Sequence, residues 1–247
     1  MRLPEHLYAE NVRGRRIPRV LGIVLAAWAA LGMAVLVPAA GDAAESWSVF
    51  GAALLVFAAG LVDDLAPIGP RGLRGHLRAL LSGRMTTGIL KVLVTGGAAV
   101  VAVALLDRGD AVSRLGAVTL IAATTNVWNG LDVRPGRALK AFIVLMVVVV
   151  LAGAPAHAGP IGAAVLSAAV LVLLPDLREW AMLGDAGANL LGFTAGVVLS
   201  GALPAWAMWP AAAVAVALNV VAETVTFSHV IDAVAPLRWF DRLGTRP

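Results

Sequence analysis

The chain has 247 residues, of which 60% are hydrophobic and only 14% are charged. Water-soluble domains contain about 45–50% apolar and about 25% charged residues, so this composition excludes an ordinary soluble domain. The formal net charge of +4 is small for this length, and the absence of cysteine excludes both a disulfide framework and a thiolate metal site. The hydrophobic residues fall in long uncharged runs, which predicts a protein that has lipid as its solvent.

The first nineteen residues are polar and include five arginines, without the apolar core and small-residue cleavage site of a signal peptide. We therefore expect 1–19 to be a cytoplasmic segment. Apolar runs near the length of a spanning helix follow at 20–40, 48–62, 88–106, 115–131, 141–156, 160–175, 187–203 and 205–226. They predict an all-α, polytopic membrane helix bundle with about eight transmembrane helices.

The basic residues give the expected orientation, because lysine and arginine near span ends are retained in the cytoplasm. With the N-terminus inside, only Arg108 and Arg114 of the 19 basic residues lie in outer loops. Both termini are then cytoplasmic, and 1–247 is a single integral domain of the plasma (inner) membrane. The basic residues belong to this membrane arrangement, so we expect no nucleic-acid partner. Cytoplasmic segments are predicted at 1–19, 63–87 and 228–247.

Within 63–87, leucines alternate with basic residues at helical spacing between 71 and 81. This pattern is typical of a helix lying in the membrane interface, where its basic face would attract anionic lipid or a phosphorylated ligand. A loop retained inside by its charges explains the same pattern, and the sequence leaves both interpretations open.

The acidic residues separate into two groups under this topology. The acids of the outer loops are expected to be solvated: Asp42, Glu45, Asp107 and Asp110. The other group collects at the cytoplasmic ends of three spans, where ionisable residues are functional candidates. Its members are Asp63 and Asp64 after the second span, Asn126, Asn129 and Asp132 after the fourth, and Asp185 between the sixth and seventh.

Carboxylate and amide oxygens suit a Mg²⁺ or Mn²⁺ ion that keeps waters and shares phosphate oxygens with a substrate. Cations stand beside the acids: Lys91 in the third span, then Arg134, Arg137 and Lys140. Metal and cations together can offset the charge of two phosphorylated reactants, so the pattern favours phosphoryl transfer. Each residue also has a structural interpretation. Lys91 can extend to the interface, Asp185 can cap a helix, His229 can belong to an interfacial tail, and Glu223 can pair with a cation or be neutral.

Four short motifs, in order, resemble the polyprenyl-phosphate N-acetylhexosamine-1-phosphate transferases. The polar segment Asn11-Val-Arg-Gly-Arg-Arg-Ile-Pro18 before a span is also similar to that family. The motifs are Asp63-Asp64 at a helix end, Gly88-Ile-Leu-Lys91 at a helix start, Asn126-Val-Trp-Asn129-Gly-Leu-Asp132, and Leu183-Gly-Asp185-Ala-Gly-Ala-Asn189-Leu-Leu-Gly192. The resemblance extends over most of residues 11–230.

The resemblance implies a Mg²⁺-dependent enzyme, with Mn²⁺ as an alternative metal, in cell-wall or surface-polysaccharide synthesis. A polyprenyl phosphate lipid would attack the sugar-proximal phosphate of a UDP-amino sugar and release UMP. Asp185 would be a metal ligand, and Asp63, Asp64, Asp132 and Lys91 would be catalytic. Substrate would contact Asn126, Asn129, Arg134, Arg137, Asn189 and His229. The membrane is an expected partner, and a homodimer is left open.

Three departures from the family pattern leave open a divergent subgroup, a changed donor or an inactive relative. The family continues as Asp-Gly-x-Asp-Gly, whereas Pro135 stands here at the position of the second aspartate. The late loop has one histidine, His229, in place of a pair, and about eight spans replace about ten. The alternative is a catalytically inactive relative that serves as a membrane scaffold or regulator. A transporter and an alcohol phosphotransferase acting on CDP-linked lipids fit less well, because the acids gather at one face and the Asp-Gly-x-x-Ala-Arg pattern is absent.

Overall fold

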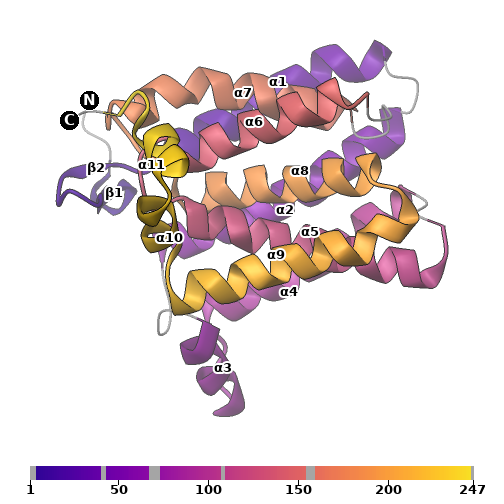
Figure 1. Cartoon of the computed structure of the whole chain (residues 1–247), viewed down its shortest axis with the longest axis horizontal. Helices are drawn as coiled ribbons and strands as arrows, with labels where there is room; N and C mark the ends of the chain where they lie inside the picture. Colours follow the sequence, from indigo (N-terminus) through magenta and orange to yellow (C-terminus); the bar gives the residue numbers. More distant parts are fainter. Residues whose placement is uncertain (1–3, 40–42, 67–72, 107–108, 154–158, 246–247) are drawn as a thin grey trace.

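The computed structural model describes residues 4–39, 43–66, 73–106, 109–153 and 159–245 (Figure 1). A hairpin of two antiparallel strands, β1 (Tyr8–Glu10) and β2 (Arg16–Pro18), precedes the helices. The helices are α1 (Leu21–Leu36), α2 (Ala43–Leu65), α3 (Leu73–Leu81), α4 (Thr87–Leu105), α5 (Ala111–Leu131), α6 (Arg137–Leu151), α7 (Gly159–Leu177), α8 (Gly184–Ala202), α9 (Met208–Thr224), α10 (Phe227–Ala233) and α11 (Ala235–Arg242). Short 3₁₀ turns lie at η1 (Glu5–Leu7), η2 (Val37–Ala39) and η4 (Ala205–Ala207).

The prediction of an all-α membrane helix bundle is confirmed. Each of the eight predicted apolar runs coincides with a helix, namely α1, α2 and α4 to α9. Five helical segments of the described chain are long and apolar enough to cross a membrane: Leu21–Ala39, Ala43–Leu65, Thr87–Leu105, Gly159–Leu177 and Ala205–Thr224. The eight-span topology and its orientation stay predictions.

Helix α8 is the central helix, and this position explains why it is less apolar than a lipid-facing span. Sixteen of its 19 residues are buried, and it packs against α1, α2, α5, α6 and α7. Its glycines allow close contact: a Cβ at Gly192 would lie 2.7 Å from the Cα of Thr125 on α5. Small residues of this kind let helix backbones approach within a membrane. Because protein surrounds α8 on several sides, polar groups such as Asn189 and Thr194 are shielded from lipid.

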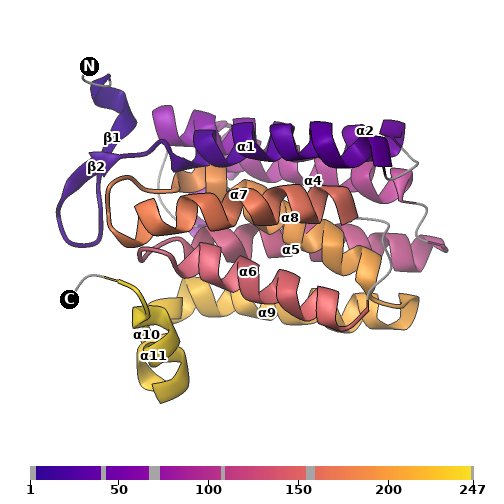
Figure 2. The same cartoon turned by 90° about the horizontal axis from the view of Figure 1, so that it is seen from above.

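The helix ends divide the molecule into two dissimilar ends (Figures 1 and 2). The β1–β2 hairpin, α10 and α11 lie at one end, together with the C-terminal end of α2 and the N-terminal end of α4. At the other end, Asp110 caps α5 by accepting a 2.7 Å hydrogen bond from the backbone N–H of Ser113. Glu45, expected to be solvated, is half-buried in the first turn of α2. Asp42, Asp107 and Arg108 lie outside the described residues.

The predicted cytoplasmic segment 63–87 contains the short helix α3, which extends from the bundle beside the start of α4 (Figure 1). Residues 67–72 of this segment lie outside the described part of the chain. His76 joins α3 to α4, because its Nδ1 lies 2.9 Å from the Oγ1 of Thr86 and its ring covers Gly88. Of the two interpretations left open for 63–87, the structure shows the helix, and it is attached to the same end of α4 that carries Lys91.

Candidate functional site

Lys91 joins two of the predicted site acids. Thr86 fixes the start of α4, since its hydroxyl accepts a 3.2 Å hydrogen bond from the backbone N–H of Ile89. One turn later, Nζ of Lys91 lies 2.7 Å from Oδ2 of Asp185 and 3.3 Å from Oδ2 of Asp63. The Thr87 hydroxyl also donates to Asp63. The Lys91 side chain is 13% exposed. Lys91, Asp63 and Asp185 therefore form a compact, partly desolvated charge cluster.

Asp64 has a different position from its neighbour, because it caps α8. Its Oδ1 accepts a hydrogen bond from the backbone N–H of Asp185 at 3.1 Å, and its Oδ2 accepts one from Ala186 at 3.0 Å. Arg19 donates to Oδ1 at 3.1 Å and to the backbone carbonyl. The residue is only 6% exposed. Asp64 was predicted to be catalytic, and in the structure its oxygens orient the start of α8. Its catalytic role stays a prediction.

Asp132 lies beside the same helix start. It ends α5 and accepts a hydrogen bond from the backbone N–H of Gly184. Desolvation raises the pKa of its carboxyl well above the usual range, and the nearby charges of Asp176 and Asp185 raise this pKa further. The structure therefore brings Asp63, Asp132 and Asp185 together with Lys91, although they come from four helices far apart in the sequence.

Asp176, near the end of α7, is a member of this neighbourhood that the sequence analysis missed. It is 4% exposed, and its Oδ2 accepts a 2.6 Å hydrogen bond from the backbone N–H of Gly136. This bond connects the turn that follows Asp132 to the end of α7, at a glycine whose φ is +73°. The signal that could have found Asp176 is the one used for Asp63, an acid at the end of an apolar run.

A cavity of about 370 Å³ opens beside these acids. One wall comes from the N-terminal hairpin and includes Glu10, Asn11, Val12 and Ile17. The opposite wall comes from the α5–α6 turn and the end of α7, and includes Asp132, Val133, Arg134, Pro135, Asp176, Ala181 and Met182. The volume suits a small organic ligand. Asp132, Asp176 and Arg134 give this cavity both negative and positive groups.

The hairpin is held against the bundle by Glu179, whose side chain is 0% exposed. Asn11 donates a 2.7 Å hydrogen bond to Oε2 of Glu179. Nε of Arg13 lies 3.3 Å from Oε1, and Arg15 lies 3.9 Å from Oε2. The backbone N–H of Met182 also donates to the carbonyl of Pro18 at 2.8 Å. The buried carboxylate of Glu179 thus binds the polar side chains of the turn between β1 and β2.

Glu179→Gln is expected to loosen this hairpin, because it removes the charge that Arg13 and Arg15 share. The loss of charge-assisted hydrogen bonds weakens docking by about 1–3 kcal/mol. Limited trypsin digestion in detergent should then cut the 13–16 segment faster than in the unmodified protein. The matched control is Glu5→Gln, because Glu5 pairs with Arg16 at the surface, where its side chain is 82% exposed. Equal cleavage rates for both variants would contradict the anchoring role.

Arg134 and Arg137, predicted to contact substrate, make ion pairs with the C-terminal helices. Arg134 lies 2.7 Å from Asp232 and 3.2 Å from Asp241. Arg137 contacts both oxygens of Asp241, at 2.6 and 3.0 Å. Lys140 donates to the carbonyls of Phe240, Asp241 and Leu243 at 2.7–3.1 Å. The hydrogen bond from Arg134 lowers the pKa of Asp232. Together these contacts attach α10 and α11 to the start of α6.

The remaining predicted substrate residues are dispersed. Asn126 is exposed and donates to Asn219 on α9 at 2.7 Å. Asn189 is 1% exposed and packs beside Gly60. A Cβ at Gly60 would lie 2.7 Å from the side-chain nitrogen of Asn189. Asn129 has a buried carbonyl oxygen without a hydrogen-bond partner, and His229 is exposed on α10. Asn126 and Asn189 therefore both contact neighbouring helices.

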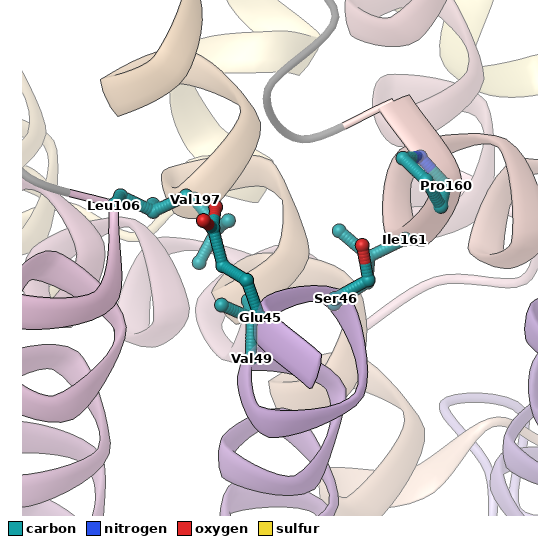
Figure 3. Close-up of a pocket in the computed structure, with 7 residues that line it drawn as sticks. All are labelled: Glu45, Ser46, Val49, Leu106, Pro160, Ile161 and Val197. Carbon is teal, nitrogen blue, oxygen red and sulfur yellow. The ribbon is translucent and has the colours of Figure 1, made fainter. Parts of the chain in front are cut away.

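A small pocket lies at the opposite end of the bundle. Figure 3 shows this pocket, with a volume of about 10 Å³, which is room for about one water molecule. Its lining comes from α2, α7, α8 and the residue after α4: Glu45, Ser46, Val49, Leu106, Pro160, Ile161 and Val197. The acids Asp63, Asp132, Asp176 and Asp185, the larger cavity and Lys91 are thus at the other end.

Within the described residues, no group of three or more histidine, aspartate or glutamate side chains is arranged to hold a metal ion. Two carboxylates, those of Asp63 and Asp185, nevertheless converge on one cation, the Lys91 ammonium. Mg²⁺ in phosphoryl-transfer sites is often held by one or two carboxylates, with substrate phosphates and waters completing the coordination. The chemistry of this donor pair therefore fits Mg²⁺ bound together with a phosphorylated ligand.

Comparison with known proteins adds no relative. No protein-family model matches the sequence, and no curated protein is significantly similar to it.

Proposed function

We propose that this chain is a membrane enzyme that transfers an amino-sugar-1-phosphate from a UDP-sugar to a polyprenyl phosphate. The observation that carries the proposal is the convergence of Asp63, Lys91, Asp132 and Asp185 at one end of the bundle. These residues come from α2, α4, α8 and the end of α5, and each belongs to one of the four motifs that resemble the transferase family. The resemblance supplies the substrates, and the geometry supplies a site of suitable charge.

The proposed reaction is a single phosphoryl transfer. An oxygen of the lipid phosphate forms a bond to the sugar-proximal phosphorus, and the bond from that phosphorus to UMP breaks. The lipid phosphate is already largely ionised near neutral pH, since its second pKa is about 6. A general base is therefore unnecessary, and Asp63 is better suited to holding a cation than to removing a proton.

Each residue then has a role that follows from its charge. Asp63 and Asp185 would hold Mg²⁺, which supplies electrostatic stabilisation of the phosphate oxygens when bound. Lys91 carries the positive charge nearest to both carboxylates and would orient and neutralise phosphate oxygens. Asp64 and Arg19 hold the start of α8 in place, and this fixes Asp185. The cavity beside Asp132 would receive the donor, and the lipid substrate would reach the site from the membrane.

The test is UMP release from purified protein in detergent with undecaprenyl phosphate and Mg²⁺. UDP-GlcNAc, UDP-GalNAc and UDP-MurNAc-pentapeptide are offered one at a time, and EDTA is added as the matched control. We expect UMP from one of these donors, and none when EDTA is added or when the lipid phosphate is omitted. Absence of UMP with all three donors would contradict the proposal.

A second candidate is a relative without catalysis that acts as a membrane scaffold or regulator. Two observations favour it: Pro135 replaces an expected aspartate, and carboxylates of the chain itself already pair with Lys91, Arg134 and Arg137. Calorimetry with UDP and with Mn²⁺ separates the two candidates, because a scaffold would bind neither.

A further inference from the structure

The ion pairs that attach the C-terminal helices to the bundle differ in burial. Asp241 is buried, with its side chain 4% exposed, and it pairs with Arg137, whose side chain is 5% exposed. The carbonyls that bind Lys140 reinforce this attachment. Asp232 lies on α10, and its side chain is 34% exposed. The buried contacts at Asp241 therefore form an anchor, whereas the contact at Asp232 is the more accessible one.

Arg134 makes this accessible contact with Asp232 and also lines the cavity. It lines the 370 Å³ space beside Asp132, and its side chain is 30% exposed. Two of its nitrogens face the two oxygens of Asp232, at 3.1 and 2.7 Å. This fork-to-fork geometry is the one by which a guanidinium binds either a carboxylate or a phosphate. Asp232 thus contacts both terminal nitrogens of Arg134, which would hold a phosphate, and one of them also lies 3.2 Å from Oδ2 of Asp241.

We propose that Arg134 is an anion-binding residue of the cavity and that Asp232 is an internal competitor for it. A diphosphate-bearing ligand displaces the Asp232 carboxylate from Arg134, while Asp241, Arg137 and Lys140 keep α11 in place. The inference deepens the proposed function, on which it rests for the diphosphate character of the ligand. It makes α10 a self-inhibitory element whose release accompanies substrate binding.

The competition has a measurable size. An exposed ion pair contributes little, so removing the competitor should tighten anion binding by only about three- to tenfold. Removing Arg134 should weaken binding far more, because its bidentate contact is lost. The probe is inorganic pyrophosphate, which carries the diphosphate group without the nucleoside, the sugar or the lipid.

The experiment is isothermal titration calorimetry of the full-length protein in detergent. Asp232→Asn should bind pyrophosphate about three- to tenfold more tightly than the unmodified protein, and Arg134→Gln should abolish binding with or without the Asp232 substitution. Glu45→Gln, which alters an acid at the opposite end of the bundle, should leave the affinity unchanged. Equal affinities for Asp232→Asn and the unmodified protein would overturn the proposal, as would full binding by Arg134→Gln.

Hydrogen exchange on the unmodified protein gives a test without any substitution. Pyrophosphate should increase exchange in residues 227–234 and leave residues 235–242 protected, because the anchor stays in place. Unchanged exchange in 227–234 at saturating pyrophosphate would also overturn the proposal. These readouts are separate from catalysis. Displacement of Asp232 by pyrophosphate without UMP release contradicts only the proposed enzyme. UMP release without this displacement contradicts only the role of Asp232.

Discussion

Asp185→Asn is expected to lower UMP release by at least about 100-fold, with little effect on folding. The substitution keeps the size and the hydrogen-bonding capacity of the side chain but removes the charge that lies 2.7 Å from Lys91. Lys91 retains a carboxylate partner in Asp63, so the stability of the bundle is largely preserved. The measurement is the initial rate of UMP release at saturating lipid phosphate, together with the unfolding temperature.

The matched control for this variant is Asn126→Ala. Asn126 also belongs to a motif resembling the family, but it is exposed and pairs with Asn219 on α9. Its loss should change the rate of UMP release much less than Asp185→Asn does. Full activity of Asp185→Asn would remove the metal role from Asp185, and with it the central claim of the proposed function.

Asp64→Ala should have the opposite effect, a large loss of stability. Three hydrogen bonds to its carboxylate disappear at once, two from the start of α8 and one from Arg19. Removing one partner of a buried ion pair costs about 3–5 kcal/mol, because the other charge stays buried without compensation. The measurement is thermal unfolding in detergent, followed by the helical signal in circular dichroism.

The neighbouring acid supplies the control for this stability prediction. In Asp63→Ala, Lys91 keeps its 2.7 Å contact with Asp185, so the unfolding temperature should fall much less than in Asp64→Ala. Similar unfolding temperatures for the two variants would contradict the prediction that Asp64 stabilises the bundle more than Asp63 does.

The sequence predicted the helices well because hydrophobic runs are a local property. All eight runs coincide with helices, and the acids at the ends of α2, α5 and α8 do lie near one another. This proximity arises because successive helices run in alternating directions. The end of α2, the end of α5 and the start of α8 therefore lie at the same end of the bundle. Residue type and helix direction were therefore sufficient to predict that Lys91, Asp63 and Asp185 lie close together.

Other features depend on contacts between distant segments and were not predictable in this way. Asp63 and Asp64 are adjacent and chemically identical, yet only the tertiary arrangement places Asp64 against the backbone N–H groups of α8. The ion pairs of Arg134 with Asp232 and of Arg137 with Asp241 were not predictable, because these partners lie 98 and 104 residues away along the chain. The hairpin that forms a cavity wall was read simply as a polar segment.

The bond between Asn11 and Glu179 spans 168 residues of sequence, and this separation sets an order of events during translation. The arginines of the hairpin leave the ribosome before any helix does, but their acceptor is made only after α7. During that interval the chain lacks Glu179, so the hairpin cannot make its contacts with the bundle. The wall of the cavity that the hairpin forms is thus completed only after the end of α7 has been made.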